Sequence, residues 1–144
     1  MKTFLTLIIL HSTFCVLTAQ LKVITSPDAP KAIGPYSQAI EANGFVFLSG
    51  QIAIDPATST MIENDIEKQT RQIFANIRAV LKEAGTDITK VVKCTVFMID
   101  LNDFAKMNKI YEEEFAGHKP ARSTVQVARL PKDALIEIEC VVVK

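Results

Sequence analysis

The chain has few of the residues that build metal and redox centres. Its 144 residues contain no tryptophan, two histidines and three cysteines, with no Cys-x-x-Cys and no His-x-x-x-His spacing. Metal sites need several such ligands close together, so the sequence predicts no metal site. Cys94 and Cys140 both fall in apolar, strand-like segments. We expect them to be reduced core residues, because two positions inside strands rarely meet the geometry of a disulfide.

An excess of charge of either sign is also missing. Sixteen basic and sixteen acidic residues cancel, and the sequence pI is near 6.7. Without a basic run, the chain lacks the electrostatic signature of a nucleic-acid-binding protein. Apolar residues make up 49 % of the chain and charged residues 22 %, a balance typical of a globular protein whose length suits one domain.

The N-terminus differs in kind from the rest of the chain. Lys2 supplies a positive start, an apolar run follows from Phe4, and Ala19 is a small residue before Gln20. This order is typical of a secretory signal peptide, so we expect residues 1–19 to be a cleaved leader and residues 20–144 to form a single domain. The expected location is the secretory pathway, with no membrane contact after leader removal. The alternatives are an uncleaved anchor, or a cytoplasmic or organellar protein.

Apolar periodicity beyond the leader predicts an α+β fold. The expected fold is a mixed six-stranded sheet with two helices packed on one face. Nothing in the chain remains to cover the opposite apolar face, which indicates a homo-oligomer. The expected elements are a strand at 21–24, a hairpin of 38–42 and 45–49 around Asn43-Gly44, a helix at 65–84 capped by Asn64, a strand at 91–99 buried on both faces, a helix at 102–115, and two strands between 120 and 143 joined by a turn at 131–133.

Arg122 and Glu137 are the candidate functional pair. Each is a charged residue in an apolar strand, where burial is costly unless the charge is paired, neutralised or used. On neighbouring strands near the uncovered face, a guanidinium and a carboxylate could hold an anionic substrate and position a water. The alternative is an ordinary ion pair at a subunit interface. Asn108 interrupts the apolar stripe of the second helix. A helix-packing hydrogen bond is the favoured interpretation there, ahead of a ligand contact.

Several motifs together resemble the RidA (YjgF) family of reactive-intermediate deaminases. The resemblance extends over residues 21–144 and is carried by the segments 32–39, 47–51, 100–104, 120–123, 128–131 and 136–139. It implies a chorismate-mutase-like fold, a homotrimer with three clefts between subunits, and no cofactor. It also implies hydrolysis of 2-aminoacrylate, 2-iminopropanoate and 2-iminobutanoate to 2-oxo acids and ammonia.

The resemblance also implies roles for individual residues. Arg122 would hold the substrate carboxylate and Glu137 would position the attacking water. Substrate-binding residues would complete the cleft, with Tyr36 and Asn108 reaching in from the adjacent subunit; the set is Tyr36, Ser49, Gly50, Asn108 and Thr124. Thr124 stands where many relatives carry a cysteine, so thiol chemistry is lost at that place. The alternatives to deamination are a trimer that binds small carboxylates, or acts like a chaperone, without turnover and, disfavoured by the balanced charge, an endoribonuclease.

Overall fold

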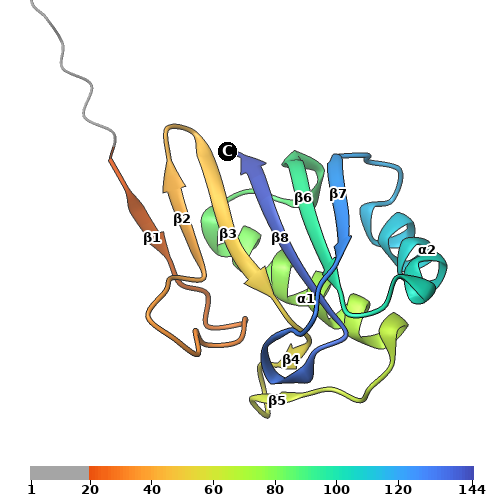
Figure 1. Ribbon diagram of the computed structural model, residues 1–144. Helices are drawn as coiled ribbons and strands as arrows, with labels where there is room; N and C mark the ends of the chain where they lie inside the picture. The colour runs from red at the N-terminus through yellow and green to blue at the C-terminus, as the bar shows by residue number, and fades with distance from the viewer. Residues whose placement is uncertain (1–19) are drawn as a thin grey trace, which may run out of the picture.

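The computed structural model describes residues 20–144, and the expected leader at 1–19 lies outside them (Figure 1). Within the described residues, no helix is both long and apolar enough to cross a membrane. The strands are β1 (Lys22–Ile24), β2 (Ala39–Ala42), β3 (Phe45–Gln51), β4 (Ile54–Asp55), β5 (Thr60–Met61), β6 (Val91–Met98), β7 (Ala121–Gln126) and β8 (Ile136–Val143). The α-helices are α1 (Ile66–Ala84) and α2 (Phe104–Phe115), and short 3₁₀ turns lie at Ile88–Lys90, Leu101–Asp103 and Pro131–Asp133.

The main sheet is mixed and has six strands in the order β1-β2-β3-β8-β6-β7, which confirms the predicted sheet. One expectation about its connectivity was wrong, because β7 and β8 do not form a hairpin. β7 pairs in parallel with β6, and β8 inserts antiparallel between β3 and β6. The connection that contains the turn at Pro131–Asp133 therefore crosses β6 on its way from β7 to β8.

Both helices cover one face of the sheet, as the sequence predicted, and α1 passes behind the strands in Figure 1. Two crossovers of the same hand, β3 to β6 through α1 and β6 to β7 through α2, place the helices on the same side. The cap of α1 is Asp65, whose side chain accepts from the backbone N–H of Lys68, so the assignment of the cap to Asn64 was wrong by one residue. Gly85 ends the helix in the left-handed region at φ 75°.

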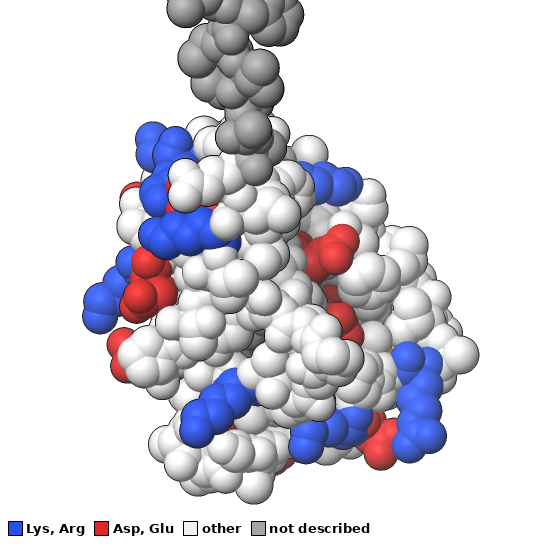
Figure 2. Space-filling view, turned by 90° about the vertical axis from the view of Figure 1, so that its left-hand side faces the viewer, with Lys and Arg blue, Asp and Glu red and all other residues white. Residues whose placement is uncertain are grey.

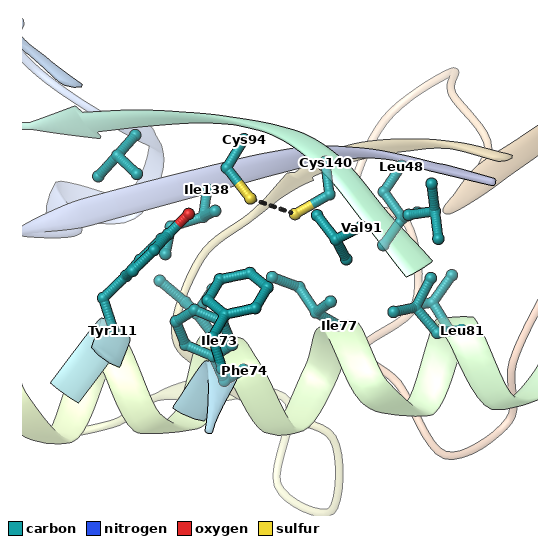
Figure 3. Packing of buried hydrophobic residues seen from close by; sticks show 14 of the residues in the cluster. Leu48, Ile73, Phe74, Ile77, Leu81, Val91, Cys94, Tyr111, Ile138 and Cys140 are labelled. Atoms are coloured by element: carbon teal, nitrogen blue, oxygen red, sulfur yellow. Dashed lines mark hydrogen bonds between the residues drawn. The ribbon is translucent and has the colours of Figure 1, made fainter. Parts of the chain in front are cut away.

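The core lies between the helices and the sheet. Apolar side chains from α1, such as Ile73, Phe74 and Ile77, pack against β6 and β8 (Figure 3). β8 alternates as its sequence predicts, with its even-numbered residues from Ile136 to Val142 buried under the helices. The expectation that β6 is buried on both faces was wrong for the single chain, because Val92 is exposed and Phe97 is only partly covered.

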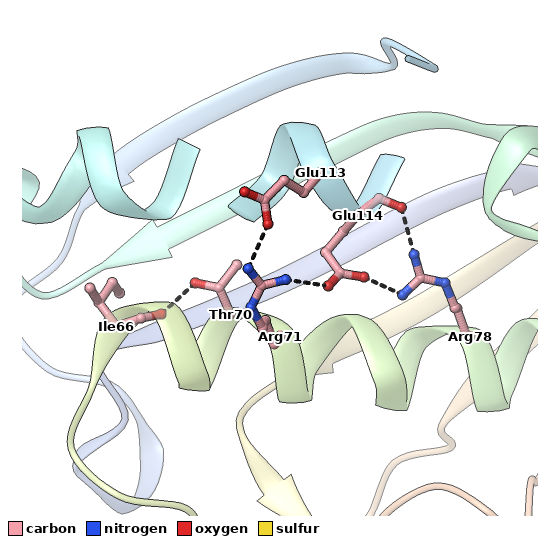
Figure 4. Close-up of polar contacts among 6 residues, drawn as sticks. All are labelled: Ile66, Thr70, Arg71, Arg78, Glu113 and Glu114. Carbon is pink, nitrogen blue, oxygen red and sulfur yellow. Dashed lines mark hydrogen bonds and ion pairs between the residues drawn. The ribbon is translucent and has the colours of Figure 1, made fainter. Parts of the chain in front are cut away.

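An ion-pair network fixes α2 against α1. Glu114, which is largely buried, accepts hydrogen bonds from Arg71 and Arg78, and Arg71 also pairs with Glu113 (Figure 4). Arg78 additionally donates to the backbone carbonyl of Glu114. Since α2 carries Asn108 and Tyr111, this network fixes the element on which part of the candidate site is built.

The other face of the sheet is uncovered by the described chain. It carries exposed apolar side chains, namely Val23, Phe45, Phe47, Val125 and Val143. At the β1 end of the molecule, Lys and Arg side chains lie scattered around a largely uncharged surface and do not gather in one patch (Figure 2). An apolar sheet face of this kind is typical of a surface that a protein partner covers.

Candidate functional site

Arg122 lies in the first of two cavities that contain predicted site residues. Its Nη2 donates a hydrogen bond of 2.8 Å to Oδ1 of Asn108. Its guanidinium carbon stands 4.4 Å from the centre of the Tyr111 ring and 5.5 Å from that of Phe104. The cavity beside it has a volume of about 320 Å³ and is lined by Asn108, Tyr111, Glu112, Gly117, His118, Lys119, Pro120 and Arg122. An amide and an aromatic face thus hold the cation in place.

Among the arginines of residues 20–144, Arg122 differs in having no carboxylate partner. Arg71 and Arg78 pair with glutamates of α2, and Arg129 pairs with Asp133. Within residues 20–144, no carboxylate lies within ion-pairing distance of the half-buried Arg122. A guanidinium has five N–H donors and Asn108 takes one of them, so donors remain for an anion. This arrangement suits a ligand carboxylate.

Asn108 joins the second helix to the strand that carries Arg122. It is half-buried on α2, and its side chain accepts a hydrogen bond from Arg122. Because Tyr111 follows three residues later on the same helix face, one turn of α2 supplies both the hydrogen bond and the ring beneath the guanidinium. The hydrogen bond joins α2 to β7 and so agrees with the favoured interpretation of Asn108 as a helix-packing contact, and a ligand contact of Asn108 stays a prediction.

Glu137 lies in the second cavity, on β8. That cavity has a volume of about 270 Å³ and is lined by Ile33, Tyr36, Ser49, Gly50, Ile52, Pro131 and Glu137. The register between β3 and β8 shifts between Leu48 and Gln51, so that Ser49 and Gly50 form a bulge. A β-carbon on Gly50 would overlap the Glu137 carboxylate. Glycine at this position is therefore what allows the carboxylate to lie against the backbone of β3.

The loop before β2 supplies the other wall of the Glu137 cavity. Tyr36 is 48 % exposed, and its hydroxyl accepts a hydrogen bond from the backbone N–H of Ile33. Ser49 joins this loop to β3, because its hydroxyl donates to the carbonyl of Ser37 over 2.7 Å. Gln38, buried beneath the loop, holds it through hydrogen bonds with the backbone of Ser26 and Pro30. The aromatic ring is thus fixed at the cavity while staying accessible.

Burial changes the acidity of Glu137. Desolvation, with a smaller contribution from the nearby Glu139 carboxylate, raises the pKa of Glu137 above its ordinary value. A carboxylate of raised pKa is a stronger base, which suits Glu137 to take a proton from water and to return it. No ion pair to Glu137 occurs among the described residues.

The two cavities lie on opposite faces of the sheet, which corrects two expectations. Arg122 stands in register with the buried Cys94 and faces the helices, whereas Glu137 stands in register with Phe97 on the uncovered face. Their strands are also not neighbours, because β6 separates them. Arg122 is therefore not on the open face, and one chain does not bring it to Glu137. Asn108 lies beside Arg122 in the same chain, so the expectation that it reaches Arg122 from the adjacent subunit was wrong. Tyr36, Ser49 and Gly50 accompany Glu137.

Thr124 and Tyr111 complete the comparison with the sequence. Thr124 is half-buried on the helix side of β7 but lines neither cavity, and its hydroxyl has no hydrogen-bond partner among the described residues. Tyr111, whose ring lies under Arg122, was not among the predicted site residues. Its spacing of three from Asn108 was the available signal. In the described part of the chain, no cluster of three or more His, Cys, Asp or Glu side chains could hold a metal.

The sequence matches known proteins over nearly all of the described chain. The family model described as Endoribonuclease L-PSP matches residues 26–144. A RutC family protein of Pyrococcus horikoshii is 54 % identical, over 85 % of this chain and 98 % of its own length. The 2-iminobutanoate/2-iminopropanoate deaminase of Bos taurus is 42 % identical, over 85 % of this chain and 90 % of its own length.

A solved structure supports the fold independently. The crystal structure of Escherichia coli TdcF with bound serine matches with a TM-score of 0.82 and 44 % identity. The match covers 85 % of this chain and 98 % of that one. The sheet with two helices on one face is thus shared with a protein that holds a small amino acid.

Proposed function

This chain belongs to the Endoribonuclease L-PSP family, the RidA (YjgF) family that its motifs resemble. On that premise, we propose that it hydrolyses 2-imino and 2-enamine acids. The products are 2-oxo acids and ammonia, and 2-iminopropanoate and 2-iminobutanoate are the proposed substrates. The observation that carries the proposal is the half-buried Arg122 guanidinium, which Asn108 and Tyr111 hold without a carboxylate partner among residues 20–144. The activity of the bovine relative and the serine bound to TdcF both involve small α-carboxylates.

In the proposed site Arg122 binds the substrate carboxylate. A guanidinium offers two parallel N–H donors to a planar carboxylate, a geometry that a lysine ammonium does not reproduce. The Asn108 hydrogen bond and the Tyr111 ring fix the plane of this fork before substrate arrives. Orientation of the substrate is then obtained without rearranging the arginine.

Glu137 acts as the general base and then as the general acid. As a water oxygen bonds to C2 of the iminium, the carboxylate takes one water proton and the C=N electron pair moves to nitrogen. The protonated carboxyl then returns this proton to the amine nitrogen of the tetrahedral intermediate. The C–N bond breaks and ammonia leaves, while the hydroxyl gives its proton back to the Glu137 carboxylate and becomes the carbonyl of the 2-oxo acid. The raised pKa of Glu137 suits both directions of proton transfer.

The site requires two copies of the chain. Because Arg122 and Glu137 face opposite sides of one sheet, the proposed cleft takes Arg122 and Asn108 from one subunit. The neighbouring subunit contributes Glu137 together with Tyr36, Ser49 and Gly50. The uncovered apolar sheet face supplies a surface for such contacts, and the family resemblance makes a homotrimer the proposed assembly.

Binding without turnover is the competing function. A cleft with the same Arg122 geometry would hold a small carboxylate equally well, and only the base distinguishes the two cases. Ribonuclease activity, which the name of the family model suggests, has less support. The chain has a formal net charge of zero, and three of its four arginines are engaged in ion pairs with glutamate or aspartate.

The test is a coupled assay on the full chain. A threonine dehydratase generates 2-iminobutanoate, semicarbazide competes for the imine, and formation of the 2-oxo acid is followed with and without the protein. We expect faster 2-oxo acid formation, and its loss in Arg122→Ala and Glu137→Gln. A correctly folded oligomer that binds 2-oxobutanoate in calorimetry but leaves the rate unchanged would make it a binding protein instead.

A further inference from the structure

Cys94 and Cys140 face each other across the two central strands. Cys94 on β6 stands directly in register with Cys140 on β8, and their Sγ atoms are 3.3 Å apart (Figure 3). Both thiols are free in this structure, and their residues are 0 % and 2 % exposed. They lie on the helix-covered face, in the middle of the core.

The register removes the geometric objection to a disulfide between them. Residues directly opposite each other in an antiparallel pair have Cα atoms about 4.5–5.5 Å apart. Bridged cysteines have Cα separations of about 4.4–6.8 Å, so no movement of the two strands past each other is required. Both side chains also point to the same face of the sheet, toward α1.

The surroundings make the two thiols unequal. The hydrogen bond from Cys140 lowers the pKa of Cys94, and the positive charges of Arg122 and Lys93 act in the same direction. The same contact, together with burial, raises the pKa of Cys140. The Tyr111 hydroxyl, which has no hydrogen-bond partner among residues 20–144, points from α2 toward this pair (Figure 3). In the folded chain, Cys94 is therefore the more acidic of the two thiols.

We propose that Cys94 and Cys140 close to a cross-strand disulfide when the chain folds in the presence of a disulfide-bearing oxidant. One of the two cysteine thiolates attacks one sulfur of the oxidant's disulfide, giving a mixed disulfide and releasing one oxidant thiol. The other cysteine thiolate then attacks the cysteine sulfur of this mixed disulfide and releases the second oxidant thiol. The cysteine pair loses two electrons and two protons, and the oxidant gains both. Because the pair is buried in the folded chain, this exchange takes place before the core has closed over it.

The disulfide would join two functional parts of the fold. The loop that it closes runs from β6 to β8 and contains α2 and β7, and therefore Asn108 and Arg122. It would also tie β6 to β8, the strand that carries Glu137. A covalent link of this kind chiefly restricts the unfolded chain, so the oxidised protein should unfold at a higher temperature than the reduced protein.

The experiment uses the full chain carrying Cys15→Ser, so that Cys94 and Cys140 are its only thiols. The protein is unfolded and reduced, then refolded either with reduced glutathione alone or with a mixture of oxidised and reduced glutathione. Free thiols are blocked with maleimide in denaturant and the intact mass is measured. We expect two maleimide adducts after reducing refolding and none after oxidative refolding. The oxidised sample should give a linked peptide containing both cysteines and a higher unfolding temperature.

A matched variant and a second arm keep the outcome decisive. Cys15→Ser with Cys140→Ala leaves one thiol, which should never give an internal link. In the second arm, folded protein is held with oxidised glutathione at the midpoint of its denaturant transition, where chains open and reclose, so that the result does not depend on refolding yield. Two free thiols, or glutathione on each cysteine, in natively folded protein from both arms would overturn the proposal.

Discussion

Gly50 and Glu137 lie so close across β3 and β8 that any side chain at position 50 would displace the carboxylate. A β-carbon there would overlap Oε1 of Glu137 and stand 2.7 Å from its Cδ. The β3 bulge at Ser49 and Gly50 therefore determines where the carboxylate of the proposed base, Glu137, can lie.

We predict that Gly50→Ala lowers kcat on the order of a hundredfold while leaving the fold intact, because a base displaced by about 1 Å no longer reaches its water. The coupled imine assay measures this loss. In a Glu137→Gln background the same substitution should have no further effect, since the group that it displaces is already inactive. Independent, additive losses would show that Gly50 acts on something other than Glu137.

Substitution of Arg122 should weaken catalysis where substitution of another arginine does not. Arg122→Ala removes the proposed two-pronged contact. We expect the activation free energy for kcat/KM to rise by about 3 kcal/mol, which lowers kcat/KM on the order of a hundredfold. Arg122→Lys should recover little of it, because an ammonium does not match the fork. Arg129→Ala, which breaks only an exposed pair with Asp133, is the matched control and should keep full activity. Equal losses in both arginine variants would contradict the role given to Arg122.

The pH profile should respond to Glu139, which lies beside the base without being part of it. Because the Glu139 charge contributes to the raised pKa of Glu137, Glu139→Gln should move the acid limb of kcat/KM to lower pH. The plateau rate should remain, since Glu137 is intact. Steady-state rates across a pH series measure this shift. An acid limb that stays in place would mean that a group other than Glu137 sets it.

Stability should also record the burial of Glu137. Its folded pKa lies above its unfolded one, so the unfolding free energy falls as pH rises from the unfolded value through the folded value, and the cost persists above that range. Glu137→Gln should therefore raise the denaturant midpoint at neutral pH and leave it unchanged near pH 3, where both states of the wild type are protonated. A midpoint gain that is the same at both pH values would contradict this origin.

The ion pairs between α1 and α2 predict changes in stability that do not involve the proposed catalytic residues. Glu114 is largely buried and accepts from two arginines, so Glu114→Ala should lower the unfolding free energy by about 2–3 kcal/mol. Glu113 has a more exposed side chain, and Glu113→Ala should cost about 0–1 kcal/mol. Chemical denaturation of the two variants gives both values. Similar losses would mean that burial of Glu114 adds nothing to its ion pairs.

The sequence predicted the layers of the fold better than its connections. Periodicity identified α1, α2 and the alternating face of β8, because each depends on residues close together in the chain. The sequence-based prediction joined β7 to β8 as a hairpin, because the residues of the turn at Pro131–Asp133 carry no information about β6, which lies between the two strands. Parallel pairing between β6 and β7 is a long-range outcome that a single sequence does not encode in its turns.

The candidate site shows the same division. The residue types were recognisable from their motifs, and Gly50, expected among the substrate-binding residues, lies against the Glu137 carboxylate. The side of the sheet on which Arg122 lies was not recognisable, since strand alternation fixes relative faces within β7 but not which face the helices cover. The partnership of Asn108 and Arg122 likewise depends on how α2 packs beside β7.

The central claim is that Arg122 and Glu137 act together only across two copies of the chain. Its most direct test mixes the inactive variants Arg122→Ala and Glu137→Gln, unfolds them together and refolds them into mixed oligomers. If each cleft takes its arginine and its glutamate from different copies, about a quarter of the clefts should contain both wild-type residues and activity should return in that proportion. Mixed oligomers, verified by mass, that stay as inactive as either parent would contradict the account.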